Sequence, residues 1–101
     1  KFDVRGLTIQ GEGKSSVLKA DSSLTDAILQ SLYDERSNVT YLDNVIIEKI
    51  NFDGQGRNVS GFKATGFTRG CVVRDCYFID CGHACIEIAV SWSFALERNN
   101  S

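Results

Sequence analysis

The segment 70–81, with the sequence GCVVRDCYFIDC, recurs in altered form along the chain. Shifted back by 26 residues it aligns with residues 45–53 (VIIEKINFD), and shifted forward by 23 it aligns with residues 94–101 (FALERNNS). A fainter copy, residues 7–11 (LTIQG), opens the chain. A unit of this length is too short for a pair of helices and is close to one turn of a β-solenoid. The repeat therefore predicts stacked coils built from short strands.

The alignment also brings residues of like character into columns along the axis of the predicted coils. One inward column is apolar throughout and holds Ile9, Ile47, Val73 and Leu96, and a second sets Phe52 on Phe78. Outward positions alternate in charge, in the column Gln10, Glu48, Arg74 and Glu97 and in the pair Lys63 and Glu87. Parallel strands lie about 4.8 Å apart, so opposite charges in one column stabilise the stack by roughly 0.2 to 1 kcal/mol per pair. The charges thus support the register that the apolar residues indicate.

This register predicts an all-β fold, a parallel β-helix of about four coils with three short strands per coil. Residues 1–101 are expected to form a single segment of a longer solenoid that continues past Ser101. The predicted strands are 7–9, 17–20, 39–42, 45–48, 61–65, 71–74, 77–78 and 85–90. Residues 22–33 fit either a strand or a short helix capped by Thr25 or Asp26, and the phase of the repeat favours the strand. The absence of proline suits a fold in which almost every backbone N–H is bonded to a neighbouring coil.

Three stretches carry a resemblance to a known family: LTIQGEG, VIIEKINFDGQG and CVVRDCYFIDC. They resemble coils of the pectin-lyase-like superfamily of right-handed parallel β-helix proteins, and are most similar to bacteriophage tailspikes and related polysaccharide-degrading enzymes. The resemblance implies a right-handed coil and a partner that is a polysaccharide or cell-wall glycopolymer. It further implies a homotrimeric parent protein in the virion, as a phage tail appendage assembled in the host cytoplasm. Two alternatives stay open: a secreted microbial polysaccharide lyase or hydrolase, and a structural stem whose active groove lies elsewhere.

Composition argues against several other classes of function. The chain has 11 Lys and Arg against 13 Asp and Glu, a net charge of −2, so it lacks the basic surface that nucleic-acid binding requires. No apolar run approaches the roughly 18 residues that cross a bilayer. The four cysteines, Cys71, Cys76, Cys81 and Cys85, lack the C-x2-C pair of zinc sites and are expected to be free, mostly buried thiols. We therefore expect no metal, no cofactor, no nucleic acid and no membrane insertion.

Three carboxylates are candidates for catalysis: Asp53, Asp80 and Glu87. A glycosidase needs two carboxylic acids about 5 to 9.5 Å apart, on either side of the sugar bond. Asp53 and Asp80 follow the Phe52 and Phe78 anchors in successive coils, one position out of register, which predicts a comparable separation on one edge. Turn-forming Asp and salt-bridged Glu are the plainer interpretation. Whether the chain belongs to a glycoside hydrolase, a polysaccharide lyase or no enzyme stays open at this point.

Three further side chains are candidates for substrate binding: Arg57, His83 and Trp92. Arg57 lies in the turn-rich loop 53–58, and His83 is the only histidine of the chain. Trp92 stands between two serines, and its flat ring suits the C–H face of a pyranose. The plainer interpretations are a loop histidine and a tryptophan that packs on a neighbouring coil.

Overall fold

The computed structural model describes residues 2, 5–31 and 41–101, so the first half of the predicted strand 39–42 and the end of the segment 22–33 lie outside them. The described residues form ten short strands and one 3-10 turn, η1 (Gly13–Ser15). The strands are β1 (Thr8–Gln10), β2 (Val17–Lys19), β3 (Ala27–Gln30), β4 (Ile46–Glu48), β5 (Asn51–Asp53), β6 (Ser60–Thr65), β7 (Val72–Arg74), β8 (Tyr77–Ile79), β9 (Ile86–Ala89) and β10 (Ala95–Glu97). The ambiguous segment after Ser22 is therefore a strand, β3, as the phase of the repeat predicted.

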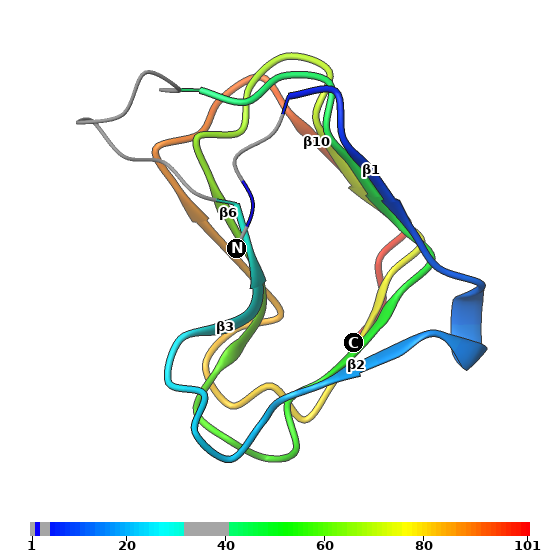
Figure 1. The fold of residues 1–101 in the computed structure, drawn as a ribbon, viewed down its shortest axis with the longest axis vertical. Coiled ribbons are helices and arrows are strands. Elements are labelled where there is room, and N and C mark those ends of the chain that lie inside the picture. The colour runs from blue at the N-terminus through cyan, green and yellow to red at the C-terminus, as the bar shows by residue number, and fades with distance from the viewer. Residues whose placement is uncertain (1, 3–4, 32–40) are drawn as a thin grey trace.

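These strands pair in parallel into three sheets that form the sides of one coil (Figure 1). Sheet A has the order β1-β4-β7-β10, sheet B the order β2-β5-β8 and sheet C the order β3-β6-β9. The chain passes from A to B to C, clockwise and away from the viewer in Figure 1, so the coil is right-handed. The predicted right-handed parallel β-helix with three strands per coil is confirmed. The described residues complete three coils and begin a fourth.

The strand register is the one that the sequence columns indicated. Ile9 pairs with Ile47, Ile47 with Val73 and Val73 with Leu96, and Phe52 pairs with Phe78. The second coil spans 26 residues and the third 23, as predicted, but Thr8 pairs with Ile46, so the first coil spans 38. Most of the added residues lie between β3 and β4, because Leu29 and Ile47 are 18 positions apart whereas Phe62 and Val73 are 11 apart. Most of the others lie between β1 and β2, where η1 forms.

Inward side chains fill the narrow interior of the coil. The rings of Phe52 and Phe78 stack with their centroids 5.0 Å apart and their planes 7° apart, and both side chains are buried. Full burial of a side chain of this size stabilises the fold by roughly 1.5 to 3 kcal/mol. Leu96 continues the sheet A column but is 45% exposed, because no described strand pairs with the far edge of β10. The interior is therefore a stack of like residues, one layer per coil.

The cysteines are free thiols, as expected. Cys71 and Cys76 are buried in the core, whereas Cys81 and Cys85 are only partly buried, which corrects the expectation for this second pair. Burial raises the pKa of the Cys76 and Cys81 thiols above the ordinary value, and the neighbouring Cys85 adds to the rise at Cys81. These two thiols therefore stay protonated at neutral pH and behave as small apolar side chains.

The corner between sheets A and B repeats one unusual backbone conformation. Lys49, Asp75 and Arg98 each follow the last strand residue in sheet A and adopt positive φ, at 58°, 54° and 50°. Arg98 donates two hydrogen bonds to Asp75, of 2.8 and 3.1 Å, and this pairing holds the pKa of the Asp75 carboxyl below its ordinary value. The corner thus carries a second column of alternating charge, which the sequence analysis missed.

The first charge column is confirmed where it was predicted. Glu48 pairs with Arg74 in the sheet register, and Arg74 pairs with Glu97. The Arg74 Nε atom lies 2.9 Å from the Glu48 Oε2 atom, and the Glu48 side chain is only 12% exposed. Arg74 therefore compensates the charge of Glu48, whose carboxylate is largely shielded from water. On the next coil, Glu97 occupies the position beside Arg74 in the sheet register.

Reversing the charge of Arg74 should destabilise the chain more than removing it. Arg74→Ala is expected to cost about 1 kcal/mol, whereas Arg74→Glu sets three carboxylates at about 4.8 Å steps. The excess should shrink between 0.05 and 1 M salt, where the screening length falls to about 3 Å. Urea denaturation at both ionic strengths measures it. Equal midpoints for the two variants at low salt would mean that the column contributes no electrostatic energy.

Candidate functional site

The candidate residues gather at two corners of the coil, at the bottom and the top of Figure 1. The turn from sheet B to sheet C, formed by residues 20–26, 54–59 and 80–85, is here named the Arg57 corner. The turn from sheet C to sheet A, formed by residues 41–45, 66–71 and 90–94, is named the Trp92 corner. Arg57, Asp80 and His83 lie in the Arg57 corner, with Asp53 and Glu87 on the strands that flank it. Trp92 alone among the predicted residues lies in the other corner.

The two aspartates at the Arg57 corner act as turn residues. Asp53 ends β5, and its two carboxylate oxygens accept hydrogen bonds from the backbone N–H and the side-chain amide of Gln55, at 2.9 and 2.7 Å. Asp80 has a φ of 50°, and its carbonyl oxygen accepts a hydrogen bond from Gly56 N. Asp53 pairs with Ile79, so Asp80 is one position further along, as predicted. The Asp53 side chain and the Asp80 backbone thus take part in the turns, which supports the plainer interpretation of both residues.

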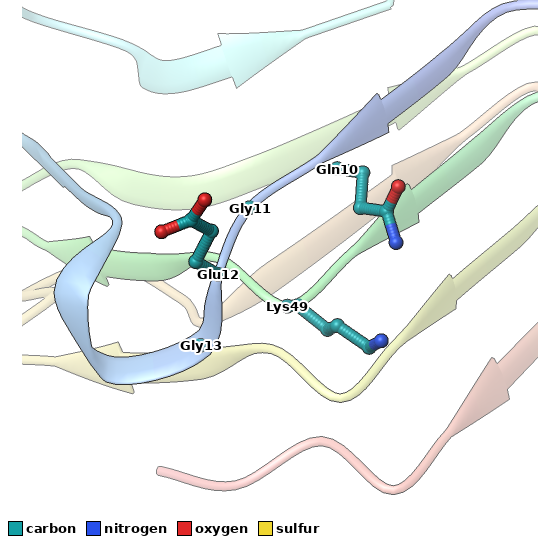
Figure 2. A pocket seen from close by; sticks show the side chains of 5 residues that line it. All are labelled: Gln10, Gly11, Glu12, Gly13 and Lys49. Atoms are coloured by element: carbon teal, nitrogen blue, oxygen red, sulfur yellow. The ribbon is translucent and has the colours of Figure 1, made fainter.

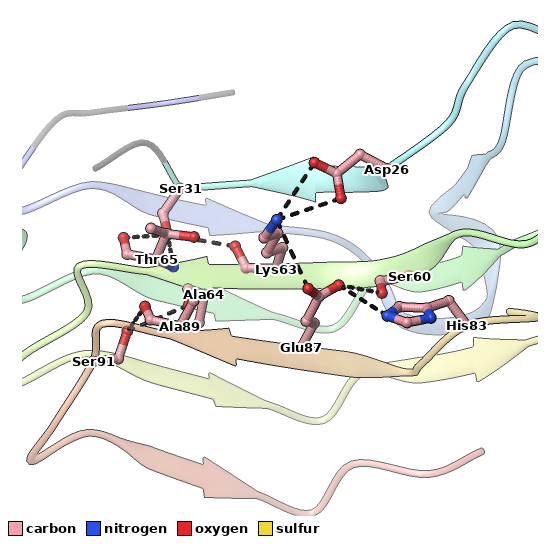
Figure 3. Close-up of polar contacts among 10 residues, drawn as sticks. All are labelled: Asp26, Ser31, Ser60, Lys63, Ala64, Thr65, His83, Glu87, Ala89 and Ser91. Carbon is pink, nitrogen blue, oxygen red and sulfur yellow. Dashed lines mark hydrogen bonds and ion pairs between the residues drawn. The ribbon is translucent and has the colours of Figure 1, made fainter. Parts of the chain in front are cut away.

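Glu87 lies on sheet C in a network that joins three coils (Figure 3). Its Oε1 atom accepts a hydrogen bond from Ser60 Oγ at 2.8 Å and lies 3.6 Å from His83 Nε2. Its Oε2 atom lies 3.7 Å from Lys63 Nζ, which in turn lies 3.5 Å from Asp26. The predicted pair Lys63–Glu87 is confirmed. Glu87 therefore has the salt-bridged environment of a structural carboxylate. His83 belongs to the same network through its contact with Glu87.

Arg57 lines an open polar hollow on the outside of the Arg57 corner. Its Nη1 atom donates a 3.5 Å hydrogen bond to the Ser22 carbonyl. The hollow has a volume of about 650 Å³ and is lined by Leu24, Thr25, Gln55, Gly56, Arg57 and Asn58. His83 lies on the next coil, because Gly82 N and His83 N donate to the carbonyls of Arg57 and Val59. The corner offers hydrogen-bonding groups but no aromatic surface among the lining residues.

The Trp92 corner combines an aromatic surface with polar groups. Trp92 N donates to Phe67 O at 2.9 Å, which fixes the residue on the coil, and its side chain is 50% exposed. The Trp92 ring packs edge-on against Tyr41, with centroids 4.6 Å apart and planes at 65°. Both residues line a pocket of about 330 Å³, together with Asp43, Thr68, Arg69 and Ser93. The tryptophan packs on a neighbouring coil, as the plainer interpretation held, and still leaves half of its surface to solvent.

Sequence reasoning found Trp92 but not the residues around it. The repeat contained the missing signal, because the shift of 26 residues that aligns the coils also sets Asp43 on Arg69. The structure confirms this proximity: Asn44 N donates to Arg69 O and Thr68 N donates to Leu42 O. The predicted strand 39–42 includes Tyr41. In the structure Tyr41 is not part of a strand, and the next residue, Leu42, forms only an isolated bridge with Phe67.

A third hollow lies at the corner between sheets A and B (Figure 2). It has a volume of about 570 Å³ and is lined by Gln10, Gly11, Glu12, Gly13 and Lys49. The Glu12 and Lys49 side chains point in different directions in Figure 2, and the lining contains no aromatic ring. This hollow therefore lacks a surface on which a sugar ring could stack.

Comparisons with known proteins add no relative. No family model, no curated protein and no solved structure matches the chain, so the resemblance to pectin-lyase-like proteins stays an expectation. The described residues contain no helix long and apolar enough to span a membrane. Nor do residues 2, 5–31 and 41–101 hold a cluster of three or more His, Cys, Asp or Glu side chains able to hold a metal ion.

Proposed function

We propose that the chain is a carbohydrate-binding segment of a tailspike-type β-helix protein that holds a host cell-surface polysaccharide at the Trp92 pocket. The exposed Trp92 ring, supported by Tyr41 and surrounded by polar side chains, is the observation that carries the proposal. The proposal includes a homotrimeric parent protein in a phage virion, and a secreted protein with the same pocket is the alternative location.

The chemistry of the pocket suits a sugar ring. A pyranose has one face of C–H groups that stacks on an indole, and hydroxyls at its edge that need hydrogen-bonding partners. Trp92 and Tyr41 supply the apolar surface, and Asp43, Thr68, Arg69 and Ser93 supply acceptors and donors at its rim. Half of the Trp92 surface is in contact with water. A ligand that stacks on the ring would remove this apolar surface from water, which favours binding.

Binding is favoured over cleavage by the environment of the predicted catalytic carboxylates. Asp53 accepts hydrogen bonds from Gln55, and Glu87 is held by Ser60 and Lys63. Glu87 also lies on a different sheet from Asp53, and Asp80 occupies a turn position with a φ of 50°. Glycoside hydrolase or polysaccharide lyase activity is therefore not part of the proposal for these coils.

The proposal is tested with an array of purified bacterial capsular and O-antigen polysaccharides. Trp92 is the only tryptophan of the chain, so a change in its fluorescence reports binding at this pocket alone. We expect at least one polysaccharide to shift the emission, and Trp92→Ala to lose at least tenfold in affinity on the array.

Tyr77→Ala is the matched control, because Tyr77 is an exposed aromatic side chain, 42% exposed, on sheet B. It should bind as the unaltered chain does. The proposal fails if no polysaccharide binds, or if Trp92→Ala and Tyr77→Ala retain equal affinity.

A further inference from the structure

Two charged side chains of the Trp92 pocket, Asp43 and Arg69, form no salt bridge with another residue that the structure describes. Asp43 and Arg69 lie on adjacent coils, held there by the hydrogen bond from Asn44 N to Arg69 O of 3.2 Å, and both line the pocket. Among the described residues, neither takes part in a salt bridge. Both groups are thus available to a ligand.

Elsewhere on the coil, opposite charges on adjacent coils do pair. Three pairs at equivalent positions of the repeat form salt bridges among the described residues, namely Glu48 with Arg74, Asp75 with Arg98, and Lys63 with Glu87, and Lys63 also pairs with Asp26. Asp43 and Arg69 also occupy equivalent positions on adjacent coils, but they form no salt bridge with each other. Both line the pocket that contains the exposed Trp92 ring. This contrast indicates that Asp43 and Arg69 do not stabilise the stacking of the coils by pairing, and that their role is to bind a ligand.

A carboxylate and a guanidinium at the edge of an aromatic surface match the hydroxyls of a neutral sugar. A carboxylate accepts hydrogen bonds from two adjacent hydroxyls, and a guanidinium donates to hydroxyl and ring oxygens. Asp43 is partly buried whereas Arg69 is exposed, so solvent screens the charge of Arg69 more than that of Asp43. Arg5, whose Nε atom donates to the Tyr41 carbonyl, is not among the lining residues. A carboxylate on the ligand would meet both Arg69 and Asp43, and we expect repulsion by the less screened Asp43 to outweigh attraction by the exposed Arg69.

We infer that the Trp92 pocket recognises a neutral hexose unit with adjacent hydroxyls and discriminates against sugars that carry a carboxylate. The inference rests on the proposed function and specifies the substrate class of the same pocket. In this account Asp43 has two effects: it accepts hydrogen bonds from a neutral sugar, and its charge repels an acidic one.

The test uses the acidic polysaccharides of the array, each before and after chemical reduction of its carboxyl groups to alcohols, beside the neutral members. Affinity is measured by Trp92 fluorescence for the unaltered chain, for Asp43→Asn and for Glu12→Gln. Glu12→Gln removes one negative charge at the corner between sheets A and B, outside the pocket, and serves as the control for net charge.

We expect neutral or carboxyl-reduced polysaccharides to bind at least tenfold more tightly than the acidic forms. Asp43→Asn should weaken the binding of neutral polysaccharides. It should also reduce the ratio of the affinity for neutral forms to the affinity for acidic forms by at least fivefold, whereas Glu12→Gln should leave that ratio unchanged. Tighter binding of the acidic forms, or a ratio insensitive to Asp43→Asn, overturns the inference and leaves the proposed function in place. If no polysaccharide in any form changes the Trp92 emission, the proposed function itself fails, and the inference fails with it.

Discussion

Phe52→Ala is expected to lower the free energy of unfolding by about 3 to 5 kcal/mol. The Phe52 side chain is 0% exposed and stacks on Phe78 of the next coil, so its removal leaves a cavity between two coils. Strand pairing on either side holds the coils at a fixed spacing, which limits how far the cavity can collapse. Urea denaturation followed by far-UV circular dichroism measures the loss.

Two substitutions control for this result. Phe52→Leu keeps most of the buried volume and should cost much less than Phe52→Ala. Val17→Ala alters a side chain that is 44% exposed on the neighbouring strand β2 and should change the stability by about 0.5 kcal/mol or less. A loss from Phe52→Ala no larger than that from Val17→Ala would show that Phe52 is not a core residue.

Gly54→Ala is the second substitution with a large expected effect, about 3 kcal/mol. A Cβ atom at Gly54 would overlap the carbonyl oxygen of Asp80 and lie 2.7 Å from the Cα atom of Cys81. Both are backbone atoms of the next coil, held by the hydrogen bond of 2.8 Å from Gly54 N to Ile79 O. The two coils would have to separate at this point, which breaks strand pairing in sheet B.

Gly56→Ala is the matched control for Gly54→Ala. Gly56 has a φ of 72° and no atom within 4 Å of a built Cβ, so alanine there adds backbone strain of about 1 to 2 kcal/mol without a clash. We expect Gly54→Ala to shift the urea midpoint further than Gly56→Ala does. The reverse order would show that backbone conformation, and not the approach of the coils, explains the glycine at position 54.

The stacking of the coils was predictable because it depends on a repeated pattern of residue types. Apolar residues had to face inward at equivalent positions, and the column Gln10, Glu48, Arg74 and Glu97 fixed the register independently. A slip of one residue would have sent this column inward. The 38-residue first coil was not predictable, because its added residues carry no copy of the repeated unit.

The sites were less predictable than the strands because they depend on turns. Asp75 and Arg98 both have positive φ and their side chains are hydrogen-bonded to each other. Asp75 is a common turn residue, but Arg98 is not a residue type that indicates such a turn as glycine does. At the Trp92 pocket, Tyr41 and Trp92 are 51 positions apart in sequence and meet only because two corners stack. Reasoning from strand periodicity contains no information on how corners pack.

The most direct test of the account is where a bound polysaccharide contacts the coil. Two-dimensional NMR of the 15N-labelled chain, with oligosaccharide fragments of the best array ligand, measures this residue by residue. The account predicts that the indole N–H of Trp92 and the amides of Thr68, Arg69 and Ser93 shift most, while those of Arg57, Asn58 and His83 stay in place. Shifts confined to Arg57, Asn58 and His83 would contradict it and assign the ligand to the Arg57 corner.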